Sequence, residues 1–249
     1  MARRMIEQRL TCGMAATFLQ EILQVCLQAC YIPCMPSIGF LAQKGGAGKT
    51  TLAVHLAVLA GDALMVDLDP QRSAAEWWES RAAELPELAV GEARDLAEAL
   101  AAAKRAWVLI DTAPHAAEDA RTVAGLVDLV VIPTRPAILD LRAIRATVEI
   151  VQRAGARAVI VLNSCPAARG IAEASVTSEA RTALAAYGLP VAPVAIIQRA
   201  ALTHALNDGR AVTEYEPNGK AADELRSLWR WINGQARPDA ARRAPQRGR

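Results

Sequence analysis

The stretch from residue 43 to residue 51 constrains the fold of this chain more than any other part of it. An apolar run at 38–42 precedes it, and apolar residues with helical spacing follow it over 52–60. A glycine-rich turn between a strand and a helix lets backbone N–H groups and the helix dipole converge on phosphate oxygens. The stretch therefore predicts a phosphate-binding loop, with Lys49 on the phosphates and Thr50 on Mg²⁺. Its residues are Gln43, Lys44, Gly45, Gly46, Ala47, Gly48, Lys49, Thr50 and Thr51.

The loop departs from the ordinary signature G-x-x-x-x-G-K-[ST]. Gln43 occupies the position of the first glycine, and an extra lysine, Lys44, precedes the remaining glycines. The resulting K-G-G-x-G-K-T-T pattern resembles the deviant Walker A loop of the ParA/MinD group of P-loop ATPases. The resemblance implies that Lys44 crosses a dimer interface to the nucleotide of the other subunit. It also implies that residues 45–51 hold ATP.

Acidic residues follow two of the apolar runs further along the chain. Asp67 and Asp69 end the run 63–66, and Asp111 ends the run 107–110. Ligands of open α/β sheets bind at the carboxyl ends of such strands. The stretch 67–71 resembles the D-x-D-P-Q motif (Walker A′) of ParA proteins, and residues 107–114 resemble a Walker B strand with its D-T-P-P end. The resemblance implies that Asp69 places the attacking water, that Asp67 belongs to the Mg²⁺ and switch region, and that Asp111 ligates Mg²⁺.

Two further positions are nucleotide candidates by resemblance. Asn163 ends the apolar run 158–162, where the ParA/MinD group places an adenine contact; a turn-forming Asn is the alternative. Arg199 lies in a segment that resembles the family's I-x-x-R-x-A-L-x-x-A stretch near the nucleotide and the dimer contact. For Trp77 and Trp78 we favour core or dimer packing over adenine stacking. His115 is not expected to be a catalytic base, because phosphoryl transfer leaves the protein little proton chemistry.

Length and composition fit a single α/β domain. The chain has 249 residues, of which 53% are hydrophobic and only 4% aromatic, so Ala, Val, Leu and Ile must build the core. Such a core suits a buried parallel sheet covered by Ala-rich helices. We expect a three-layer α/β/α P-loop NTPase with a mostly parallel, doubly wound sheet. The expected ATPase domain is 35–234, between an N-terminal extension at 1–34 and a basic, disordered tail at 235–249.

Several helices are predicted outside the loop. Ser73 should cap a helix that runs to residue 85, with Glu76 completing a capping box. Other helices are expected at 94–104, 138–153 and 172–187. A last helix should dock on the core and stop at Asn233 and Gly234. Its apolar face is formed by Leu225, Leu228, Trp229 and Ile232.

The two ends of the chain differ in composition from its body. Four of the five cysteines (Cys12, Cys26, Cys30 and Cys34) lie before the loop. For Cys26, Cys30 and Cys34, which are four residues apart, helix packing is favoured over a metal site, since no His or fourth close ligand is evident. Residues 1–34 are either an appended segment or an upstream stretch translated from an alternative start. The odd cysteine count and the lack of a secretory signal predict a reducing, cytoplasmic location. The last fourteen residues carry five arginines, which would attract DNA phosphates or keep the chain soluble.

The resemblance to ParA proteins implies a DNA-partition ATPase for plasmids or chromosomes. Its homodimer would form on ATP binding, bind DNA without sequence preference at the nucleoid, and hydrolyse ATP when a small DNA-binding ParB-like adaptor stimulates it. Stable membrane association is not expected. The alternatives are a MinD-like positioning ATPase at a membrane or protein scaffold, and a non-hydrolysing interaction module, which Asp69 and Asp111 disfavour. Candidate DNA contacts are Arg199, Arg210, Lys220 and Arg226.

Overall fold

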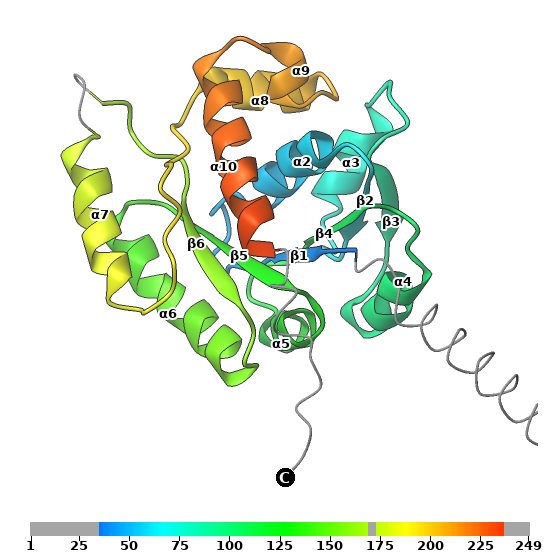
Figure 1. The fold of residues 1–249 in the computed structure, drawn as a ribbon, viewed down its shortest axis with the longest axis horizontal. Coiled ribbons are helices and arrows are strands. Elements are labelled where there is room, and N and C mark those ends of the chain that lie inside the picture. The colour runs from blue at the N-terminus through cyan, green and yellow to red at the C-terminus, as the bar shows by residue number, and fades with distance from the viewer. Residues whose placement is uncertain (1–34, 169–172, 237–249) are drawn as a thin grey trace, which may run out of the picture. The chain divides into compact units, whose positions relative to one another are not determined.

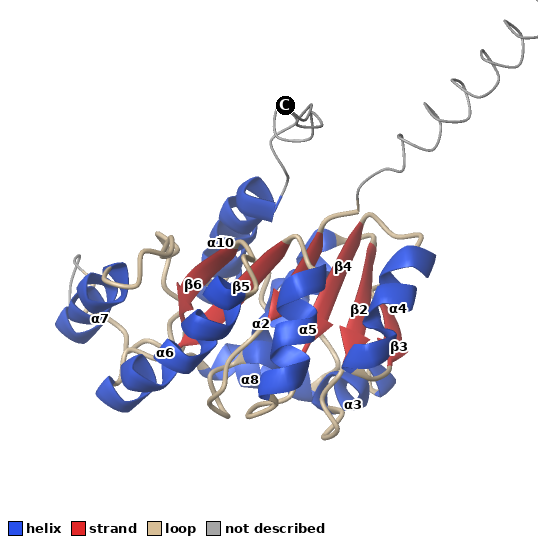
Figure 2. Cartoon of the chain, turned by 90° about the horizontal axis from the view of Figure 1, so that it is seen from below, coloured by secondary structure: helices blue, strands red, loops and turns tan. Residues whose placement is uncertain are grey.

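A six-stranded parallel sheet forms the centre of the molecule. The computed structural model describes residues 35–168 and 173–236. The strand order is β3-β2-β4-β1-β5-β6, and every neighbouring pair is parallel (Figure 2). The strands are β1 (Ser37–Phe40), β2 (Ala63–Asp67), β3 (Glu87–Val90), β4 (Trp107–Asp111), β5 (Leu129–Thr134) and β6 (Ala158–Leu162).

The inner strands are buried on both faces, as their apolar runs predict. Every residue of β1, β4, β5 and β6 is buried, whereas the edge strand β3 exposes Glu87 and Val90. Continuous Val, Ile and Leu runs are typical of a parallel sheet that helices cover on both sides. The short run at 88–90 thus becomes the edge of the sheet.

Helices cover both faces of this sheet (Figure 1). One hydrophobic cluster joins the sheet to α2 (Lys49–Ala60), α8 (Ala200–Asn207), α9 (Val212–Tyr215) and α10 (Lys220–Ala236). A second cluster on the opposite face joins it to α4 (Leu96–Ala102), α5 (Ala117–Leu126), α6 (Ile138–Arg153) and α7 (Ser175–Ala185). The predicted three-layer α/β/α fold is confirmed.

Helix α10 docks on the core, but it does not end where the sequence suggested. Leu225, Leu228 and Ile232 are fully buried, and Trp229 packs edge-on against Trp107 with ring centroids 4.7 Å apart. The expected stop at 233–234 is wrong, because the helix continues to Ala236, which is fully buried. Burial of Ala236 thus prevails over the preference of glycine for a helix end.

The helix expected at 73–85 is shorter than predicted. Helix α3 covers only Ser73–Glu79. Beyond it, the Arg81 side chain pairs with Glu214 at 2.7 Å and donates to the Gly209 carbonyl, which draws the chain towards α9. This tertiary contact ends the helix early.

The predicted capping box at Ser73 is also wrong. Ser73 is the first residue of α3, and the capping position is Arg72, whose φ of 54° lies in the left-handed region. The Asp67 carboxylate instead accepts the Ala75 N–H at 3.0 Å. A residue at the end of β2 therefore satisfies the helix terminus.

Two other helices differ from their expected bounds. The helix expected at 94–104 is a 3₁₀ turn, η1 (Ala93–Asp95), followed by α4. Helix α7 begins at Ser175, and residues 169–172 lie outside the described residues. The predictions for residues 1–34, including four cysteines, and for the arginines beyond 236 likewise fall outside them. Within the described ranges, no helix has both the length and the apolar character that a bilayer crossing requires.

Candidate nucleotide-binding site

The glycine-rich loop joins β1 to α2 at the carboxyl edge of the sheet. Gly46 and Gly48 have φ values of 73° and 95°, which side chains rarely adopt. A Cβ on Gly48 would lie only 2.0 Å from Asn163 Nδ2. Gly48 is therefore required both for its backbone angle and for the close approach of β6.

Asn163 holds this loop in place from the end of β6. Its Nδ2 donates to the Ala47 carbonyl at 2.9 Å, and its backbone N–H donates to the Thr134 carbonyl at 2.8 Å. The side chain is buried. These bonds give Asn163 a positioning role, which sequence reasoning missed. The predicted adenine contact of Asn163 stays a prediction.

Lys49 is buried at the start of α2. Its Nζ donates to the Ala42 carbonyl at 3.4 Å, and only 6% of the residue is exposed. Burial lowers the pKa of Lys49, while the charges of Asp111 and Asp69 act in the opposite direction. A desolvated ammonium among these groups gains from an approaching phosphate, because charges interact strongly where water is excluded.

Asp67 and Asp111 are brought together by the pairing of their strands. They face each other in the register of β2 and β4. Burial raises the pKa of Asp111 to about 7; the nearby Thr50 hydroxyl and the charge of Lys49 act in the opposite direction, and the charges of Asp67 and Asp69 raise it further. Asp111 Oδ1 accepts the Thr112 N–H, but Oδ2 is buried with no hydrogen-bond partner among the described residues. An orphaned carboxylate oxygen beside a threonine hydroxyl fits Mg²⁺.

Asp67 orients the segment that carries Asp69. Its Oδ1 accepts the Asp69 N–H at 3.0 Å, and its Oδ2 caps α3. Burial raises the pKa of Asp67, against the lowering effect of these backbone bonds. Asp69 Oδ1 accepts the Gln71 N–H at 2.9 Å and the residue is half-buried. The predicted Mg²⁺ role of Asp67 and the water-placing role of Asp69 stay predictions.

The extra lysine of the loop has a partner on α6. Lys44 Nζ lies 2.9 Å from Asp140 Oδ2; the lysine side chain is 41% exposed and the carboxylate 9%. The preceding residue is also tied to α6, because Thr147 Oγ1 accepts the Gln43 N–H at 3.1 Å. Sequence reasoning missed Asp140 and Thr147, which lie about a hundred residues from the loop and carry no motif.

His115 connects the Walker B segment to the loop through its backbone. Its N–H donates to the Gln43 carbonyl at 3.3 Å, and its φ of 61° is unusual for a non-glycine residue. The imidazole is exposed. Strained residues often gather at functional sites, and here the strain lies at the end of β4.

Trp77 and Trp78 pack against the hydrophobic core, as we favoured over adenine stacking. Trp77 is only 6% exposed and belongs to the cluster under α2 and α10. Trp78 is partly buried against the same cluster, and its Nε1 donates to the Pro86 carbonyl at 2.8 Å.

Arg199 lies before α8 and is held by α10. Its guanidinium lies 2.6 Å from Glu224 Oε1, and the other oxygen of that carboxylate accepts the Ile197 N–H. The Nε of Arg199 is buried without a hydrogen-bond partner in the described part of the chain. The predicted nucleotide contact of Arg199 stays a prediction.

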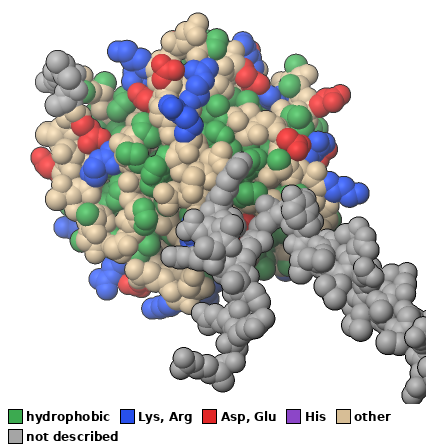
Figure 3. Space-filling view, viewed as in Figure 1, with side chains coloured by type: hydrophobic (Ala, Val, Ile, Leu, Met, Phe, Trp, Pro, Cys, Tyr) green, Lys and Arg blue, Asp and Glu red, His purple; other side chains and the backbone are tan. Residues whose placement is uncertain are grey.

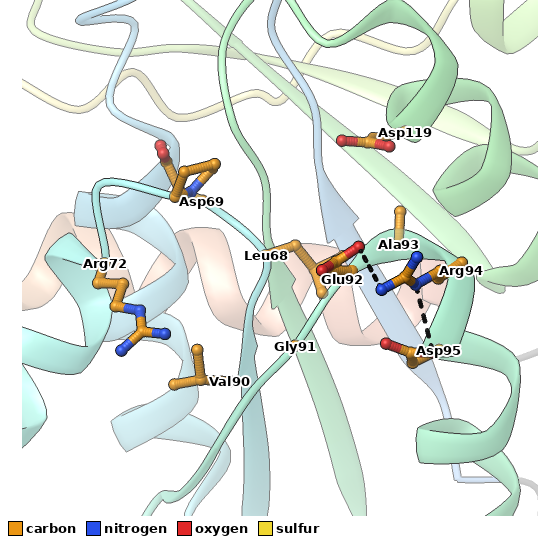
Figure 4. A pocket seen from close by; sticks show the side chains of 11 residues that line it. Leu68, Asp69, Arg72, Val90, Gly91, Glu92, Ala93, Arg94, Asp95 and Asp119 are labelled. Carbon is orange, nitrogen blue, oxygen red and sulfur yellow. Dashed lines mark ion pairs between the residues drawn. The ribbon is translucent and has the colours of Figure 1, made fainter.

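An open hollow of about 660 Å³ lies beside Asp69 (Figure 4). Asp69 and Arg72 line it from the end of β2, and Arg94 lies across it, paired with Glu92 and Asp95. Residues 43–51 do not line it. The hollow is therefore formed by the ends of β2 and β3 and the segments after them, not by the phosphate-binding loop.

Residues 38–212 match the family model described as the CobQ/CobB/MinD/ParA nucleotide binding domain. A "Maintenance of carboxysome distribution protein A" of Gloeobacter kilaueensis is 34% identical over 205 residues, covering 78% of this chain and 91% of that protein. A "Protein ParA" of Rhizobium radiobacter is 33% identical over 153 residues, 54% of this chain and 68% of that protein.

Solved structures show the same fold with nucleotides bound. A variant of Cyanothece McdA in complex with ATP matches with a TM-score of 0.66 at 16% identity, over 81% of this chain and 96% of that one. The septum site-determining protein MinD of Pyrococcus horikoshii, complexed with Mg-ADP, matches with a TM-score of 0.62 at 18% identity, over 80% and 96%. ATP and Mg²⁺ are the ligands that this site fits. The chain belongs to the ParA/MinD family of nucleotide-binding ATPases.

Proposed function

We propose that this chain is a Mg²⁺-dependent positioning ATPase that distributes a cargo, with DNA as the surface along which it works. Two subunits close over two ATP molecules, the dimer binds DNA without sequence preference, and an adaptor bound to the cargo stimulates hydrolysis. The observation that carries the proposal is the assembly of Lys49, Thr50, Asp69 and Asp111 around one loop that also bears Lys44.

Each residue of this assembly has a separate task in the proposed reaction. The loop amides and Lys49 bind the phosphates, while Thr50 and Asp111 Oδ2 would hold Mg²⁺, which would supply positive charge against the phosphate oxygens. Asp69 orients the attacking water from the turn that Asp67 fixes. Lys44 leaves Asp140 and donates to the phosphates of the other subunit's nucleotide.

The candidate DNA contacts differ in their availability. Arg199, Arg210 and Arg226 are paired with Glu224, Asp208 and Asp223. Figure 3 accordingly shows basic and acidic side chains interspersed on one face. Lys220 is exposed and has no ion pair within the described ranges. Exposed ion pairs contribute little to stability, so their arginines can bind DNA phosphates instead. Lys220, Arg210 and Arg226 therefore remain the proposed DNA contacts.

The cargo has two candidates. The sequence resemblance favours plasmid or chromosome DNA, and the similarity to a ParA supports it. The relatives named for carboxysome distribution favour a protein assembly as the cargo. As the surface on which the dimer works, a lipid membrane is a weaker candidate than DNA, because the apolar residues of α10 are buried in the core.

Co-sedimentation separates these surfaces. The full chain with ATP, ADP or no nucleotide is spun with plasmid DNA and, separately, with anionic vesicles. We expect ATP-dependent binding to DNA alone, weakened in Lys44→Ala. Binding to vesicles but not DNA would refute the proposal.

Hydrolysis is tested by phosphate release with Mg²⁺, DNA and a ParB-like adaptor protein. Asp69→Ala should lose the stimulated rate, and chelation of Mg²⁺ should abolish it. Equal rates for Asp69→Ala and the wild type would show that Asp69 takes no part.

A further inference from the structure

Arg135 lies beside the phosphate-binding loop and has no assigned role. It follows β5 at the carboxyl edge of the sheet. Its guanidinium Nη2 lies 3.6 Å from the position that a Cβ on Gly46 would occupy. Because Gly46 has no side chain, the loop backbone and the guanidinium face each other directly. The arginine is exposed, so a ligand at the loop can reach it.

The backbone of Arg135 is firmly placed. Thr134 is buried, its carbonyl accepts the Asn163 N–H at 2.8 Å, and its hydroxyl donates to the Arg135 carbonyl at 3.4 Å. Pro136 follows and is buried too. The residue that holds the loop, Asn163, therefore also fixes the base of this arginine. The contacts that shape the loop thus also fix the backbone from which the guanidinium extends towards Gly46.

Among the described residues around the loop, no carboxylate pairs with Arg135. Lys44 is paired with Asp140, and Lys49 faces Asp111 and Asp69. Arg135 has no carboxylate partner in the part of the chain that the structure describes. Three cations thus gather where backbone N–H groups and the start of α2 already favour an anion. A guanidinium matches the oxygens of a phosphate group better than an ammonium does, because its donors lie in one plane.

We propose that Arg135 is a phosphate-binding residue of the nucleotide site, which donates hydrogen bonds to the phosphate oxygens of ATP on the Gly46 side of the loop. The proposal rests on the proposed function and adds one phosphate-binding residue to the ATP site. The phosphates are either those of the same subunit's nucleotide or those of its partner's, which Lys44 is expected to contact. The chemistry is the same in both cases.

Two measurements test this role in Arg135→Gln and Arg135→Lys. The first is the affinity for a fluorescent ATP analogue at protein concentrations too low for self-association. The second is self-association with Mg²⁺ and ATPγS, followed by sedimentation velocity. The matched control is Arg142→Gln, which removes the same charge from an exposed arginine on α6 that has no ion pair within the described residues. Urea unfolding confirms that each variant folds.

We expect Arg135→Gln to weaken one of these equilibria about tenfold, the loss typical of one charge-assisted hydrogen bond. A loss in the affinity of the dilute chain assigns Arg135 to its own nucleotide, and a loss only in self-association assigns it to the partner's. Arg135→Lys should retain part of the effect, and Arg142→Gln should match the wild type.

Three results would overturn the inference. They are wild-type behaviour of Arg135→Gln in both measurements, an equal loss in Arg142→Gln, and a defect confined to DNA co-sedimentation. Failure of the proposed function gives a different result, because the wild-type chain itself would then bind no ATP. If instead the wild type and Arg135→Gln bind ATP and self-associate equally well, only the role of Arg135 is refuted.

Discussion

Burial of His55 makes the stability of this protein depend on pH in a calculable way. His55 lies on α2 and is fully buried. Its Nδ1 accepts the Val212 N–H, the first of α9, at 3.2 Å. The imidazole must therefore be neutral, with its proton on Nε2, which has no hydrogen-bond partner in the described ranges. Burial lowers the pKa of His55 to about 4, although the charge of Glu214 opposes this.

The magnitude follows from the difference between the two states. The ordinary pKa of 6.5 applies to the unfolded chain, so the two pKa values differ by about 2.5 units. Each pKa unit corresponds to 1.36 kcal/mol, so neutral burial of His55 can lower the free energy of unfolding by at most about 3 kcal/mol at low pH. The unfolded chain takes up the proton first as the pH falls. His55 therefore costs no stability above about pH 6.5 and a growing amount down to about pH 4.

The assay compares the wild type with His55→Gln, which keeps an acceptor for the Val212 N–H. Urea unfolding of both gives their free energies of unfolding across this pH range. The stability of the wild type relative to the variant should fall by about 2 kcal/mol between pH 7 and pH 4.5. The carboxylates titrate alike in both chains and cancel. A constant difference across this range, or a charged His55 ring by NMR at pH 5.5, would refute the reasoning.

Three further predictions follow from the loop and its neighbours. Arg72→Gly should raise the free energy of unfolding by about 0.5–1 kcal/mol, because it relieves a left-handed backbone, whereas Arg72→Ala should give no gain in urea titrations. Gly48→Ala should weaken the affinity for a fluorescent ATP analogue at least about tenfold, because the methyl group would displace Asn163; unchanged affinity contradicts this. Asp140→Asn should strengthen ATP-driven self-association by about threefold in sedimentation velocity, because it frees Lys44 from its ion pair with this largely buried carboxylate; weaker association would count against the contact as a restraint on Lys44.

Local errors in the sequence prediction arose where distant contacts overruled helix signals. Ser73 and Glu76 suggested a capping box. Instead, the turn after β2 brings the start of α3 back to Asp67, whose carboxylate accepts the Ala75 N–H. Gly234 suggested a helix end, yet burial of Ala236 extends α10 past it. A capping or stop signal is worth about 1 kcal/mol, so packing of a single turn can outweigh it.

The amino-acid sequence alone was enough to predict the parallel sheet, the glycine-rich loop, and the acids at the ends of β2 and β4. Each of these depends on residues that are neighbours along the chain, so composition and spacing reveal them. The folded chain was needed to show that Asn163 supports the loop, that Asp140 pairs with Lys44, and that Arg135 lies beside Gly46. Those contacts join residues about a hundred positions apart, because the strand order places β5 next to β1 and β6 next to β5.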